Sequence, residues 1–141
     1  MGLFSGTRPD NLGVHDGRLA PPKHTPNNVN SQIDKSADAE HYIEPLSYRG
    51  DARQASAALQ RVIDGMPRVK VVKVEPNYLY AEFTSKLMGF VDDTEFYLDQ
   101  KAGVIQVRSA SRLGRRDFGV NRERIESIRA QLAQAQTGRA Q

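Results

Sequence analysis

Residues 69–112 read VKVVKVEPNYLYAEFTSKLMGFVDDTEFYLDQKAGVIQVRSASR, and this stretch decides the fold class. Apolar and polar side chains alternate along much of it, which is the periodicity of half-buried strands. Short breaks at Pro76-Asn77 and at residues 99–103 favour hairpin turns. The pattern therefore predicts an antiparallel sheet with four strands, at Val69–Glu75, Tyr78–Ser85, Thr94–Leu98 and Val104–Arg112.

The alternation also assigns the two faces of this sheet. One face carries apolar side chains and is the expected core face: Leu79, Ala81, Phe83, Phe96, Leu98, Ile105 and Val107. The opposite face carries Tyr78, Tyr80, Glu82, Glu95, Tyr97, Arg108 and Arg112. Such a mixture suits contact with water or with a polar ligand, so any site on the sheet is expected on this second face.

Two helices are expected to flank the strands. Asp51 and Gln54 have the spacing of a capping box, which places a helix start at Asp51, and Gly65-Met-Pro67 ends that helix. A second helix is predicted to begin near Asn121, a good cap residue, with an apolar stripe of Ile125, Ile128 and Leu132. The order helix, four strands, helix predicts an α+β domain over residues 46–132, with both helices packed on the apolar face of the sheet.

The ends of the chain lack this periodicity. Residues 1–45 are rich in Gly, Pro, Asn and Asp and predict a long irregular N-terminal arm. The arm is expected either to lie over the body through Leu12, Val14, Leu19 and Val29 or to be partly disordered. Residues 133–141 lack an apolar anchor and are predicted to fray.

Composition limits the classes of function. The chain has 141 residues, enough for one domain, and contains no cysteine, which excludes disulfides, thiolate metal sites and cysteine nucleophiles. No run approaches the roughly 20 apolar residues of a membrane helix and no signal peptide is apparent, so a cytoplasmic location is expected. The formal net charge is +3, yet residues 108–129 hold seven arginines against three carboxylates, a local net charge of +4. This basic segment can attract an anion, or it can be partnered by carboxylates elsewhere.

An acidic run, FVDDTEFYLD (90–99), and the basic segment after it supply the candidate site. Its expected ligand-binding residues are Asp92, Asp93, Glu95, Arg108, Arg112, Asn121 and Arg122. Arg108 and Arg112 share a strand face and can bracket an anion or pair with carboxylates. Asp92 and Asp93 can hold a divalent cation or act as acid and base only if they converge in a turn, because neighbours on a strand point to opposite faces.

Other chemistry is less well supported by the residues. His15, His24 and His41 show no metal-ligand spacing, so no metal site or cofactor is expected. Ser109 and Ser111 face the core and lie outside any nucleophile-elbow motif. The basic segment has Phe118 as its one aromatic residue and carries no nucleic-acid-binding motif, so a nucleic acid partner is not expected.

Three blocks, FVDDTEFYLD (90–99), VRSASRLG (107–114) and DFGVNRERI (117–125), resemble those of the family known as domain of unknown function 1499. NLGV (11–14) and GRLAP (17–21) resemble its N-terminal segment, so the resemblance covers about residues 8–132. It implies a bacterial-type protein with plastid relatives and no assigned activity. It also implies importance for Asp92, Asp93, Arg108, Ser109, Ser111, Arg112, Asn121 and Arg122.

The chain departs from the family at two positions. Members commonly carry a Cys-Pro-x-Ser-Pro-Asn-Cys stretch in the arm, and Pro22 and Asn28 stand here where the two cysteines would fall. A thiol or disulfide role is therefore impossible in this chain.

Taken together, the residues predict a non-enzymatic binding or interaction domain that holds an anionic small molecule or a protein partner. Two alternatives stay open at this point. Asp92, Asp93 and Glu95 can serve a hydrolase that depends on a divalent cation, or the whole polar cluster can be structural. The sequence leaves the oligomeric state undetermined.

Overall fold

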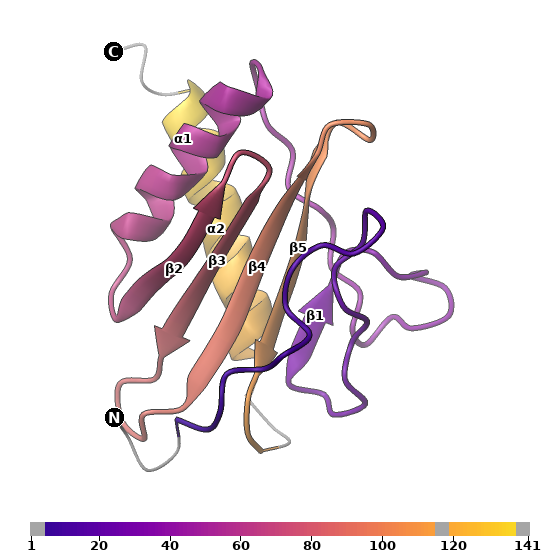
Figure 1. The fold of residues 1–141 in the computed structure, drawn as a ribbon, viewed down its shortest axis with the longest axis vertical. Coiled ribbons are helices and arrows are strands. Elements are labelled where there is room, and N and C mark those ends of the chain that lie inside the picture. Colours follow the sequence, from indigo (N-terminus) through magenta and orange to yellow (C-terminus); the bar gives the residue numbers. More distant parts are fainter. Residues whose placement is uncertain (1–4, 115–118, 138–141) are drawn as a thin grey trace.

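The computed structural model describes residues 5–114 and 119–137, and it has an α+β architecture in which two helices pack on one face of a sheet (Figure 1). The helices are α1 (Ala52–Asp64) and α2 (Val120–Thr137). The strands are β1 (Asn28–Asn30), β2 (Val69–Glu75), β3 (Tyr78–Thr84), β4 (Val91–Asp99) and β5 (Val104–Ser111). The predicted class, the antiparallel sheet and the two helices on one face are thus confirmed.

The predicted number of strands is wrong, because the sheet has five strands in the order β1-β5-β4-β3-β2. The extra strand, β1, lies inside the arm and pairs with β5, with Asn28 opposite Ala110 and Asn30 opposite Arg108. Three residues are too few to show an alternation, so the Pro- and Asn-rich context concealed this strand. β4 also starts earlier than predicted, at Val91, and this places both Asp92 and Asp93 inside the strand.

The main core lies between the helices and the face of the sheet predicted to be apolar. Leu79, Phe83, Phe96, Ile105 and Val107 are buried there against both helices. Asp51 and Gln54 form the predicted capping box of α1, and Gly65 follows its end. Within the described residues, no helix combines the length and the apolar character that crossing a membrane requires.

α2 begins at Val120, close to the predicted start near Asn121, but the role of Asn121 and the end of the helix differ from the prediction. Asn121 is the second residue of the helix, and its buried side chain bonds to the sheet instead of capping the helix start. The helix continues to Thr137, past the predicted end near Ala133. Hydrogen bonds of 2.8 and 3.0 Å between Gln136 and the backbone of Arg49 hold this last turn against the start of α1. The remainder of the predicted frayed tail, residues 138–141, lies outside the described residues.

The arm lies across the opposite face of the sheet, as the indigo ribbon in front of β4 and β5 shows (Figure 1). Leu19 is buried there with Tyr78 and Tyr80, and Leu12 and Val14 pack against the same cluster. Of the two possibilities left open by the sequence, the structure therefore shows an arm laid over the body. The polar face of the sheet is consequently covered by residues of the arm.

Candidate functional site

The predicted site residues divide between the two faces of the sheet. Because β4 is regular through Asp92 and Asp93, these neighbours point to opposite sides. Asp92 and Asn121 contact the helix side, whereas Asp93, Glu95, Arg108 and Arg112 lie under the arm. Arg122 joins neither group, and its Nη2 donates to the carbonyl of Glu40 at 3.0 Å.

On the helix side, the polar residues connect α2 to the sheet. Arg124 pairs with Asp92 at 2.9 Å (Nη2 to Oδ2) and stacks 4.6 Å above the ring of Phe83. Asn121 accepts a hydrogen bond from Ser109 Oγ at 2.6 Å and donates to Ser111 Oγ at 3.0 Å. The serines therefore face the core side, as predicted, and these contacts give this group a packing role.

Under the arm, Arg112 is surrounded by acceptors. Its Nε and Nη2 each lie 2.9 Å from an oxygen of Asp93, and Nη2 also donates to Glu82 Oε2 at 2.6 Å. Tyr80 OH donates to Asp93 Oδ1 at 2.5 Å, and Arg8 from the arm pairs with Glu82 at 2.6 Å. We call these five residues, Arg8, Tyr80, Glu82, Asp93 and Arg112, the Arg112 network.

The charges of the Arg112 network stabilise one another. The hydrogen bonds with Asp93 raise the pKa of Arg112, although burial acts against this shift. Burial opposes ionisation of Glu82, yet hydrogen bonds from Arg8, Tyr80 and Arg112 outweigh it and lower the pKa of Glu82 to about 2. Glu82 and Arg112 are therefore both charged at neutral pH.

Arg108 and Glu95 form a second, looser pair under the arm. Arg108 is 3% exposed and Glu95 is 0% exposed, and Arg108 Nη1 lies 3.9 Å from Glu95 Oε1. Glu95 Oε2 accepts from Gly13 N at 2.7 Å and from Tyr78 OH, while Oε1 finds no hydrogen-bond partner among the described residues. In the part of the chain that the structure describes, Arg108 donates to one acceptor, the carbonyl of Pro21, at 3.2 and 3.4 Å.

This second pair is poorly compensated in electrostatic terms. Burial lowers the pKa of Arg108 and raises the pKa of Glu95, so for both residues desolvation outweighs the attraction between them. A buried guanidinium with unused donors is costly unless another acceptor reaches it. The arrangement around Arg108 therefore has room for an additional negative group.

A small pocket of about 170 Å³ lies beside Arg108, between the arm and β5. Its charged lining consists of Lys23, Arg108, Arg112 and Asp93, and Thr7 and Asn11 of the arm complete one wall. Burial and the nearby Arg108 charge lower the pKa of Lys23, whose Nζ donates to the carbonyl of Ser111. Three cations thus face one carboxylate, and that carboxylate already belongs to the Arg112 network.

Asn28 holds Lys23 at this pocket. Its Oδ1 accepts from Lys23 N at 3.0 Å, and its Nδ2 donates to the carbonyl of Thr25 at 2.6 Å. These hydrogen bonds of Asn28 fix the loop that carries Lys23. Lys23 was missed by the sequence prediction because nothing in the Pro-rich arm shows which strand it covers; its charge in an otherwise turn-forming segment was the one available signal.

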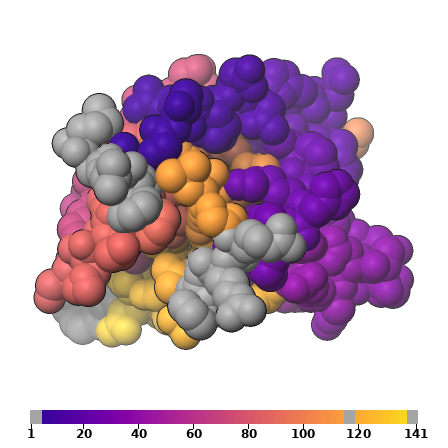
Figure 2. All heavy atoms as spheres, turned by 90° about the horizontal axis from the view of Figure 1, so that it is seen from below, coloured from indigo at the N-terminus to yellow at the C-terminus, as the bar shows by residue number. Residues whose placement is uncertain are grey.

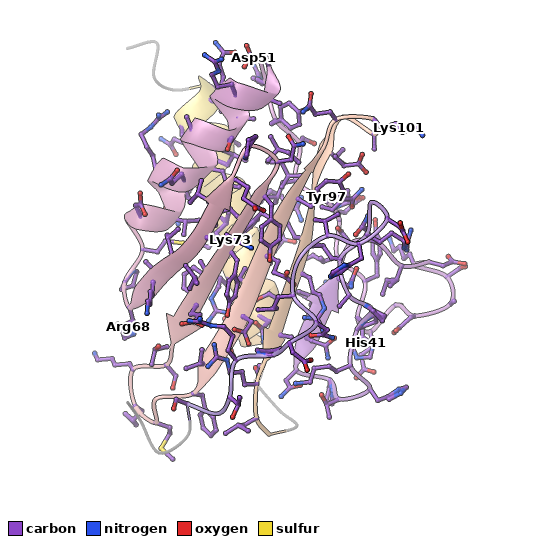
Figure 3. All side chains as sticks on the ribbon, viewed as in Figure 1. His41, Asp51, Arg68, Lys73, Tyr97 and Lys101 are labelled. Atoms are coloured by element: carbon purple, nitrogen blue, oxygen red, sulfur yellow. The ribbon has the colours of Figure 1, made fainter. Side chains whose placement is uncertain are left out.

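A metal site requires several ligating side chains to lie close together. In residues 5–114 and 119–137, no three His, Cys, Asp or Glu side chains are grouped so that they could share a metal ion. His41 is buried beside β1 (Figure 3), with Nδ1 2.8 Å from Asp38 and Nε2 2.9 Å from the carbonyl of Thr25. These contacts connect two parts of the arm.

Comparison with known proteins agrees with the resemblance found in the sequence. The model of the family described as "Protein of unknown function (DUF1499)" matches residues 18–132, which include the sheet, both helices up to Leu132 and most of the arm. Among curated proteins, none matches the chain.

Proposed function

The chain belongs to the DUF1499 family, and we propose that it is a non-enzymatic binding domain whose pocket beside Arg108 holds a carboxylate or phosphate group. The group is the anionic end of a small molecule or of a protein partner. The pocket of about 170 Å³ matches such an end group better than a whole metabolite.

The observation that carries this proposal is the state of Arg108. Its guanidinium is almost fully buried, lines the pocket, and among the described residues finds one hydrogen-bond acceptor and a carboxylate at 3.9 Å. Arginine offers five N–H donors in a fork that fits carboxylate and phosphate oxygens. An anion in the pocket would supply the acceptors that the protein itself does not place there.

The neighbouring cations favour the same class of ligand. Lys23 Nζ has three donors and one acceptor at Ser111, so donors remain that can turn toward the pocket. Arg112 adds positive potential although its own donors serve Asp93 and Glu82. Ligand binding here is expected to weaken as the salt concentration rises, because the attraction is electrostatic.

The test is titration calorimetry of the whole chain with sodium phosphate and, separately, with malonate. Arg108→Met combined with Glu95→Gln removes both charges of the buried pair and leaves neither one alone, so the variant is expected to fold. Wild type should bind at least one anion, and the double variant should bind it at least tenfold more weakly.

Arg18→Ala is the matched control, because Arg18 is an exposed arginine of the same arm and bonds to the carbonyl of Gln32, away from the pocket. Its affinity should equal that of wild type. Equal affinities in all three proteins would show that the anion binds somewhere other than at Arg108. If neither anion gave a heat of binding with wild type, the proposal would be contradicted.

A further inference from the structure

The turn between β3 and β4 presents apolar side chains to solvent. Its base is closed by two hydrogen bonds, from Ser85 N to the carbonyl of Phe90 at 2.8 Å and from Phe90 N to Ser85 Oγ at 2.9 Å. The four residues Lys86, Leu87, Met88 and Gly89 project beyond this closure. Leu87 is 85% exposed and Met88 is 49% exposed. A turn fixed at its base therefore holds two large apolar side chains in water.

Two other exposed apolar residues lie at the same end of the molecule. Val120, at the start of α2, lines one hollow together with Lys86 of the turn. Leu113 follows Arg112, whose N–H donates to the carbonyl of Val91 at the start of β4. Figure 2 looks onto this end, with the turn at the periphery and the end of β5 nearer the centre. Of five exposed large hydrophobic residues in the described parts of the chain, four are therefore gathered here.

The charged side chains that line the hollow behind the turn are three cations and two carboxylates, a small positive excess. Lys86 belongs to the turn itself, and Arg68, at the lower end of β2 in Figure 3, is fixed beside it because its Nε donates to the carbonyl of Thr84 at 3.2 Å. Both line the hollow behind the turn. The hollow also contains Arg124, which is paired with Asp92, and Glu123, its one carboxylate without such a pair among the described residues.

We propose that this end of the molecule docks on an anionic lipid bilayer, with Leu87 and Met88 inserted among the headgroups and with Lys86 and Arg68 near the lipid phosphates. A few apolar side chains and adjacent cations are sufficient for reversible attachment to such a surface. A stable protein partner needs a continuous face of about 800 Å² on each side. Four separate apolar side chains around charged residues fit the bilayer better.

This inference is independent of the pocket beside Arg108. The test is co-sedimentation of the whole chain with sucrose-loaded vesicles of phosphatidylcholine alone or of phosphatidylcholine with phosphatidylglycerol. Binding is expected to the anionic vesicles and to decrease when salt is added. Leu87→Glu combined with Met88→Glu should weaken it at least tenfold, since two apolar side chains no longer leave water and two charges oppose the lipid.

Val74→Glu is the matched control. Val74 is 46% exposed but lies near the far end of β2, opposite Leu79, whereas the docking end is next to Val69. This variant should bind the anionic vesicles as wild type does. Absence of sedimentation with either vesicle, or equal binding by the turn variant, would overturn the proposal. So would concentration-dependent dimers that disappear in the turn variant while vesicle binding is unchanged, because the turn would then be a protein interface.

Discussion

Arg108 lies in β5 and Arg112 directly follows this strand, on the same side of the sheet. Both are covered by the arm, yet their surroundings are opposite. Arg112 has two oxygens of Asp93 at 2.9 Å and one of Glu82 at 2.6 Å. Arg108 has a carbonyl at 3.2 Å and a carboxylate at 3.9 Å. One guanidinium is saturated and the other is not.

On the proposed function, this difference separates a structural arginine from a ligand-binding one. A guanidinium bound by two carboxylates has few donors left for a ligand, and removing one partner leaves the other charge buried alone. If the proposal is right, the less well satisfied Arg108 contributes less to the fold and more to recognition. The two arginines, which the sequence places in one class, therefore serve as each other's control.

The largest effect on stability is expected when the Arg112 network is disrupted. Arg112→Ala removes the cation from Asp93, which is 1% exposed, and should lower the free energy of unfolding by about 3–5 kcal/mol. Urea denaturation at neutral pH measures this change. Adding Asp93→Asn to the variant should recover part of the loss, because the uncompensated charge is then gone.

Arg8→Ala provides the comparison within the Arg112 network. Arg8 pairs with the same Glu82, but its side chain is 47% exposed, so its loss should cost no more than about 1 kcal/mol. If Arg112→Ala lowered the free energy of unfolding as little as Arg8→Ala does, the Arg112 network would not be what stabilises the fold.

A smaller effect on stability is expected when the pair of Arg108 and Glu95 is replaced. In Arg108→Met with Glu95→Gln, the free energy of unfolding should change by less than about 2 kcal/mol, because replacing both members of a poorly compensated buried pair is close to neutral. The same denaturation experiment measures it. A loss of stability as large as that for Arg112→Ala would show that Arg108 stabilises the fold as much as Arg112 does. The two arginines would then not differ in role.

The sequence predicted the strands of the main sheet and its two faces because alternation is local. Leu79, Phe96 and Val107 each face the core as their spacing requires. The same spacing predicted correctly that Asp92 and Asp93 converge only in a turn; the structure places them in a strand and on opposite faces. Local periodicity thus accounts for most of the fold.

What the sequence did not predict is set by long-range contacts of the arm. Gly13 reaches Glu95, Lys23 reaches Ser111 and Asn28 pairs with Ala110, each across more than 80 residues of chain. No periodicity in residues 1–45 indicates these partners. Only the structure therefore shows which part of the polar face is covered, where β1 pairs and where the pocket lies. The distinction between Arg108 and Arg112 depends on the same contacts.

The smallest expected effect is a difference in pH dependence between Glu82 and Glu95. The pKa of Glu82 falls from 4.5 to about 2 in the folded protein, so its stabilisation is complete above about pH 4.5 and is lost as the pH falls toward 2. Glu82→Gln should therefore flatten the acid side of the stability profile.

Glu95 has the opposite sign. Because burial raises its pKa, the unfolded chain releases this proton first, and folding becomes less favourable as the pH rises above 4.5 toward the raised value. Glu95→Gln should flatten that side of the profile and leave the acid side unchanged. Chemical denaturation at a series of pH values, about 3 to 7, measures both slopes, with differences on the order of 1 kcal/mol. If both variants changed the same side, Glu95 would be held as firmly ionised as Glu82, and the region around Arg108 would be as well compensated as that around Arg112.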